Sequence, residues 1–112
     1  MTDRQRLPAR RGALNFEVEH NLRRYTVALG FHDDGRLGEI FVTSTKAGSD
    51  SQIVANEAAV LASLLLQFGG DIEGMADAMP RNEDGSPQGI MGAVLDAALL
   101  IIPEETETSV PA

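Results

Sequence analysis

The stretch from Lys46 to Gly70 contains the longest apolar-rich segment of the chain and predicts its central helix. Ser49, followed three residues later by Gln52, fits a capping box, in which each side chain satisfies a free backbone N–H of the other residue. Gly69 or Gly70 would supply the left-handed residue with which many helices end. Apolar residues occupy most of the helix circumference, so the helix is predicted to be covered on more than one side. Its broad apolar face is expected to consist of Ile53, Ala58, Leu61, Leu64, Leu65 and Phe68.

Two segments that precede this helix, residues 14–19 and 23–31, alternate apolar and polar residues, which is the period of a half-buried strand. A third strand is predicted over residues 37–45. Residues 20–22 are predicted to form the first turn, and the pair Asp34-Gly35 predicts a hairpin turn before the third strand. Residues 40–42 are all apolar, which predicts that the third strand is more buried than the first.

Two further helices are predicted after the central one. Asp71 is a good N-cap for a helix over residues 72–79. Ser86 is predicted to cap a third helix, with Pro87 in its first turn and Pro103 at its end. The wide apolar face of this third helix is expected to contain Ile90, Met91, Val94, Leu95, Ala98, Leu99 and Ile102.

This order of elements predicts an α+β fold, a three-stranded antiparallel meander followed by three helices packed on one face. We expect a single domain over residues 13–102, a flexible basic arm over residues 1–12 and a disordered acidic tail over residues 103–112. Such a sheet has two open edges, and the third helix carries more apolar surface than one small sheet covers. We therefore expect a homodimer.

The net charge of −8 is unevenly distributed. Residues 1–46 carry eight basic and six acidic groups, whereas residues 47–112 carry one basic and eleven acidic groups. An acidic body argues against general binding to duplex nucleic acid, because phosphates would be repelled. The basic arm offers four arginines as a partner-binding site for an acidic protein or, as a further alternative, for nucleic acid; the competing interpretation is a solvated terminus. These arginines are Arg4, Arg6, Arg10 and Arg11.

The chain contains no cysteine, which excludes disulfides, thiol catalysis and thiolate metal sites within it. The absence of cysteine is consistent with a cytoplasmic protein. The first twelve residues lack the apolar region of a secretory signal, and no stretch is long and apolar enough to span a membrane. We therefore expect a cytoplasmic location without membrane insertion.

The best candidate for a ligand site is the turn from Lys46 to Ser49, which leads from a strand into a helix N-terminus. Free N–H groups at such a position favour an anion, so Lys46, Gly48 and Ser49 are predicted to hold a small anion or a nucleotide phosphate. The turn does not match the phosphate-binding loop of nucleotide hydrolases. The competing interpretation is a capped helix beside an exposed lysine.

Other polar residues are explained without catalysis. His20 and His32 lack the spacing of a metal pair on one helical face. Asp33 and Asp34 precede Gly35, as acidic residues often do in hairpin turns. No nucleophile with a matching base is evident, so we expect no catalytic residue, no metal site and no cofactor.

Three segments of the chain resemble the TSCPD-type domain. They are residues 34–42 (DGRLGEIFV), residues 46–49 (KAGS) and residues 64–73 (LLLQFGGDIE). The resemblance covers residues 13–102. This domain is found near the C-terminus of adenosylcobalamin-dependent ribonucleotide reductases and in small free-standing bacterial proteins.

The resemblance implies an accessory role rather than a reductase. The cysteine-bearing motif that names the domain is absent from this chain, so the redox relay or metal binding of cysteine-containing copies is not available to it. The radical-forming barrel and the cobalamin site would require several hundred further residues. The implied function is a non-catalytic accessory or interaction module linked to deoxynucleotide metabolism, with a ribonucleotide reductase or another protein as its partner.

Overall fold

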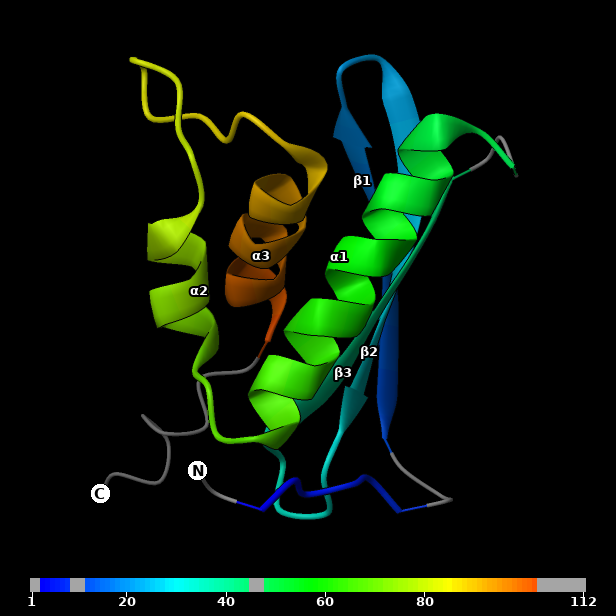
Figure 1. Cartoon of the computed structure of the whole chain (residues 1–112), viewed down its shortest axis with the longest axis vertical. Helices are drawn as coiled ribbons and strands as arrows, with labels where there is room; N and C mark the ends of the chain where they lie inside the picture. The colour runs from blue at the N-terminus through cyan, green and yellow to red at the C-terminus, as the bar shows by residue number, and fades with distance from the viewer. Residues whose placement is uncertain (1–2, 9–11, 45–47, 103–112) are drawn as a thin grey trace.

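The computed structural model describes residues 3–8, 12–44 and 48–102 and contains an antiparallel sheet followed by helices (Figure 1). The strands are β1 (Ala13–His20), β2 (Arg23–Phe31) and β3 (Leu37–Ser44), with β2 in the centre. The helices are α1 (Asp50–Gln67), α2 (Ile72–Ala78) and α3 (Ile90–Ile101). This arrangement confirms the predicted α+β meander followed by helices.

The inner face of the sheet holds the core residues of all three strands. Val18 of β1 lies opposite Tyr25 of β2, and Val27 of β2 lies opposite Val42 of β3. All four are at most 8% exposed, as the alternating pattern predicts. The outer face is mostly polar; there Glu17 and Arg24 form an exposed ion pair at 3.8 Å, which contributes little to stability because water screens it.

β3 is more buried than β1, as predicted, but only on its inner face. β3 is an edge strand, and Phe41 on its outer face is 50% exposed. Ile40 and Val42 on its inner face are almost fully buried. Three consecutive apolar residues show that a strand is apolar, but they do not show whether a second layer covers its outer face.

The buried face of α1 differs from the predicted one. Helix α1 packs along β3 through small residues, and Ala55, Ala59 and Ala62 are at most 7% exposed. Among the larger residues predicted to be inside, Ile53, Leu61 and Leu65 are at least 50% exposed. Leu64 and Phe68 are half-buried. Small side chains allow the helix backbone to lie close to the sheet, and this close fit places the bulky side chains on the opposite side.

The C-terminal end of α1 is formed as predicted. Gly69 has a φ of 104°, in the left-handed region that favours glycine. The N–H of Gly70 donates to the carbonyl of Leu65 at 2.8 Å, and the N–H of Gly69 donates to that of Leu66 at 3.0 Å. This pair of hydrogen bonds is a Schellman motif, which satisfies carbonyls left free at the helix end.

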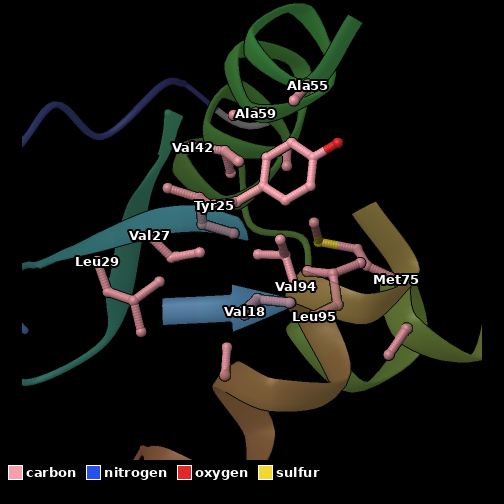
Figure 2. Packing of buried hydrophobic residues seen from close by; sticks show 14 of the residues in the cluster. Val18, Tyr25, Val27, Leu29, Val42, Ala55, Ala59, Met75, Val94 and Leu95 are labelled. Atoms are coloured by element: carbon pink, nitrogen blue, oxygen red, sulfur yellow. The ribbon is translucent and has the colours of Figure 1, made fainter. Parts of the chain in front are cut away.

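The last two helices complete the core. Helix α2 packs on α3, and α3 contacts both β1 and α1. Figure 2 shows Met75 of α2 together with Val94 and Leu95 of α3 beside the inner face of the sheet. Asp71 caps α2 by accepting a hydrogen bond from the N–H of Gly74 at 3.2 Å, as predicted.

The start of α3 lies further along the chain than predicted. Its N-cap is Gly89, without a side-chain cap, whereas Ser86 lies in the preceding loop and donates from its hydroxyl to Asp84 at 2.6 Å. Pro87 forms an isolated β-bridge with Arg81 rather than a first helical turn. Local turn contacts therefore engage Ser86 and Pro87 before the helix begins.

Arg81 joins α2, this loop and α3. Its guanidinium donates to both carboxylate oxygens of Asp96 at 2.6 and 2.8 Å. It also donates to the carbonyls of Ala76 and Gly85. The hydrogen bonds from Arg81 hold the pKa of Asp96 below its ordinary value.

This ion pair predicts a pH-dependent contribution to stability. Replacing Asp96 with asparagine is expected to lower the urea midpoint of unfolding at neutral pH, because the carboxylate is replaced by a neutral amide. A carboxyl group whose pKa is lowered in the folded state stabilises above its unfolded pKa, and the contribution disappears as the pH falls through the folded pKa. The difference between wild type and Asp96→Asn should therefore shrink below about pH 4. The exposed substitution Glu57→Gln serves as the control, and a difference that does not change with pH would contradict this assignment.

Candidate functional site

A pocket of about 340 Å³ opens at one end of the molecule. Figure 1 shows that the β1–β2 hairpin and the first turns of α1 and α3 meet at this end. Its lining comes from three parts of the chain that are far apart in the sequence. The lining residues include His20, Arg23 and Tyr25 from the hairpin, Asp50, Ser51 and Val54 from α1, and Gln88, Gly89 and Ile90 from the start of α3.

The hairpin places its polar residues at the pocket through a tight turn. Asn21 and Leu22 have φ angles of 51° and 65°, which is the backbone of the hairpin turn whose twist matches that of the strands. His20 and Arg23 therefore lie opposite each other at the end of the ladder. A ring nitrogen of His20 lies 3.2 Å from the carbonyl oxygen of Gln88, which connects the hairpin to the residues before α3.

The first turn of α1 is held by Ser49 and Gln52. The hydroxyl of Ser49 accepts a hydrogen bond from the N–H of Gln52 at 3.2 Å, which confirms this half of the predicted capping box. The side chain of Gln52 instead contacts β3: its amide donates to the carbonyl of Val42 at 3.3 Å, and its oxygen accepts from the N–H of Ser44. Gln52 thus fixes the start of the helix against the sheet.

The predicted anion-binding turn falls only partly within the described residues. Lys46 lies outside them. Gly48 has a φ of 81°, and Ser49 caps α1. The cap is present under both interpretations of the turn, so the proposed role of Lys46, Gly48 and Ser49 stays a prediction.

The four arginines of the N-terminal segment are not equivalent in the structure. Arg4 donates from Nε to the side-chain oxygen of Gln67, and Arg6 is exposed. Arg10 and Arg11 lie outside the described residues. The structure therefore places Arg4 against the domain, and partner binding by the group stays a prediction.

Gln67 has a structural role that the sequence pattern does not indicate. It is 4% exposed, and its amide donates to the carbonyl of Gly38 at 2.9 Å. Its backbone carbonyl accepts a hydrogen bond from the N–H of Gln5 at 2.7 Å. This buried amide ties the N-terminal segment, α1 and β3 together at the end of the molecule opposite the pocket.

Local hydrogen bonds account for the lowered pKa values of two acidic residues in turns. The backbone N–H and then the guanidinium of Arg36 lower the pKa of Asp34 in the hairpin turn. Hydrogen bonds from Ser86 lower the pKa of Asp84.

Among residues 3–8, 12–44 and 48–102, no group of three or more histidine or acidic side chains is arranged to hold a metal ion. Within the same residues, no helix combines the length and the apolar character needed to cross a bilayer.

The exposed side of α1 forms a second notable surface, which we call the α1 apolar face. Its members are each at least 50% exposed: Ile53, Val54, Val60, Leu61 and Leu65. Figure 1 shows α1 at the front of the molecule with the sheet behind it. The exposed acidic residue Glu57 lies one helical turn from members on either side of it along the helix. Exposed apolar surface of this kind commonly marks an interaction site.

The sequence pattern does not reveal the pocket. It predicts His20 as a turn residue and Tyr25 only as an inward residue of the second strand. One signal was available: Tyr25 is the only tyrosine of the chain and occupies an inward position, where a phenol hydroxyl needs a polar neighbour.

Comparison with known proteins identifies relatives of the chain. Residues 3–112 match the model of the TSCPD domain family. Over 78 residues the chain is 33% identical to a vitamin B12-dependent ribonucleotide reductase of Bradyrhizobium diazoefficiens (strain JCM 10833 / BCRC 13528 / IAM 13628 / NBRC 14792 / USDA 110). That match covers 70% of this chain and 6% of the reductase. The comparison with solved structures found no significant match.

Proposed function

Because the chain belongs to the TSCPD domain family, we propose that it is a cytoplasmic, non-catalytic interaction module linked to deoxynucleotide metabolism. The proposal is that it binds another protein chain through the α1 apolar face. The chain matches only 6% of the length of its reductase relative, so the reaction of that enzyme is not transferred to it. The partner proposed is a ribonucleotide reductase of the same cell.

The observation that carries this proposal is the α1 apolar face itself. Leu61 is 68% exposed and Val54 is 58% exposed, although the same helix buries alanines against the sheet. Burial of apolar area on association is the main favourable term in most protein–protein complexes. Because α1 places its bulky apolar residues outward, a partner chain that covers them would bury more apolar area than the helix buries in its own core.

Charge on this surface favours a different chain over a second copy. Glu57 lies within the α1 apolar face, and a two-fold interface centred there would bring two copies of Glu57 together. A partner with an apolar surface and an opposing lysine or arginine would satisfy Glu57 instead. The predicted homodimer remains an alternative occupant, which the mass of the particle in solution tests.

Replacing Leu61 with aspartate is expected to weaken binding to an immobilised ribonucleotide reductase of the same cell at least about tenfold, because a charge is desolvated in the interface. Leu61 is largely exposed, so the variant should keep its circular dichroism spectrum. Leu100→Asp is the matched control, since Leu100 is 88% exposed on a different helix.

Three results would count against this proposal. The first is the absence of binding by the wild-type chain, and the second is equal weakening by both variants. The third concerns light scattering: a mass of twice 12.0 kDa that Leu61→Asp halves would assign the α1 apolar face to a second copy.

A further inference from the structure

We propose that the pocket between the hairpin and the first turns of α1 and α3 binds a small organic anion, a phosphate monoester or a carboxylate with an apolar body. The inference goes beyond the interaction function and, apart from Val54, rests on different residues. It also places the anion at residues that the structure describes.

Tyr25 provides the observation that points to a ligand. The residue is 4% exposed and lines the pocket. Among the hydrogen bonds of the described residues, none involves its hydroxyl. Figure 2 shows this hydroxyl directed away from Val18, Val27 and Leu29. No fully buried side-chain polar atom of the described residues lacks a partner, so this hydroxyl is accessible from the pocket and can donate to or accept from a ligand there.

The first turn of α3 supplies hydrogen-bond donors on the opposite wall. Gly89 is its N-cap and provides no side-chain oxygen, so no side chain caps the free N–H groups of this turn. These groups carry the positive end of the helix dipole, which favours an anion. Helix α3 has 12 residues, so its dipole is fully developed.

The charged side chains decide where the anion lies. Arg23 borders the pocket, and no ion pair joins its guanidinium to a described residue. Asp50 borders it from the α1 side and repels an anion. The anionic group is therefore placed near Arg23, the Tyr25 hydroxyl and the start of α3, away from Asp50.

Val54 and Ile90 provide the apolar part of the lining. The volume of about 340 Å³ exceeds what inorganic phosphate alone would fill and falls at the lower end of the range of small-molecule pockets. A ligand with an apolar body is therefore expected to bind more tightly than inorganic phosphate.

The proposal is tested by titrating the isotope-labelled full chain with inorganic phosphate, phenyl phosphate and benzoate, with sodium chloride at matched ionic strength as the reference. Phenyl phosphate or benzoate is expected to shift the amide resonances of Gly89 and Ile90 at millimolar concentration. Tighter binding of phenyl phosphate would identify the preferred anionic group as a phosphate, and tighter binding of benzoate would identify it as a carboxylate. Equal shifts with sodium chloride, or inorganic phosphate binding as tightly as both organic anions, would overturn the proposal.

Variants of the pocket residues give a second test. Tyr25→Phe and Arg23→Gln are each expected to weaken binding of the tighter probe about tenfold, which corresponds to one hydrogen bond to a charged group. Arg24→Gln is the matched control, because Arg24 lies on the outer face beside Glu17. Asp50→Asn is expected to tighten binding by removing a like charge. An effect of Arg24→Gln equal to that of Arg23→Gln, or weaker binding by Asp50→Asn, would refute the assignment.

Discussion

Replacing Leu95 with alanine is expected to lower the free energy of unfolding by about 2–5 kcal/mol, the range for removal of a large buried aliphatic side chain. Leu95 is 1% exposed in α3, the helix that contacts β1, α1 and α2. The substitution leaves a cavity between these elements, because close-packed surroundings collapse only in part. Urea unfolding followed by far-ultraviolet circular dichroism measures the loss.

Leu100→Ala is the matched control on the same helix. Leu100 is 88% exposed, so this variant should stay within about 0.5 kcal/mol of the wild type. Equal losses from the two substitutions would show that α3 is not oriented as described. Leu99 is partly buried against the core, so a charged substitution there would affect folding as well as any dimer. A substitution at the exposed Leu100 tests the surface without disturbing the core.

Replacing Ala59 with leucine is expected to destabilise the protein by about 1–3 kcal/mol, although leucine is normally the more hydrophobic residue. Ala59 is 1% exposed at the contact of α1 with β3. The added methyl groups would push the helix away from the sheet or force unfavourable rotamers. Alanine and leucine are both strong helix formers, so intrinsic helix propensity contributes little to the difference.

The companion variant Leu61→Ala removes atoms from the opposite side of the same helix. Leu61 is 68% exposed, so its truncation should cost within about 0.5 kcal/mol. The sequence pattern alone predicts the reverse order, because it places Leu61 on the buried face. Denaturation midpoints of the two variants therefore decide directly between the predicted orientation of α1 and the observed one.

The acid-sensitive contact and the two proposed binding surfaces lie on different parts of the fold. Arg81 and Asp96 join the last two helices, whereas the α1 apolar face and the pocket share only Val54. Leu61→Asp and Arg23→Gln thus change one surface each. Loss of partner binding with the anion retained, or the converse, would show that the two functions are separate.

The elements of this fold are determined by local sequence. Alternation predicts the strands, since a strand with one buried face must repeat every second residue. Ser49, Asp71 and Gly69 mark helix ends correctly, because capping and the left-handed helix end depend on a few neighbouring residues. The order of these elements is sufficient to predict an α+β meander. Ser86 is the local signal that fails, since the loop uses it before the helix begins.

Only the tertiary structure decides which side of each element is covered. Apolar residues lie all around α1, so its pattern permits several orientations, and the close fit of Ala55 and Ala59 against β3 selects one. Gln67 is buried because the N-terminal segment and β3 both contact it at the end of α1. The pocket likewise brings together residues 20–25, 50–54 and 88–90. No local pattern encodes such a meeting, because it depends on how the hairpin, α1 and α3 pack together in space.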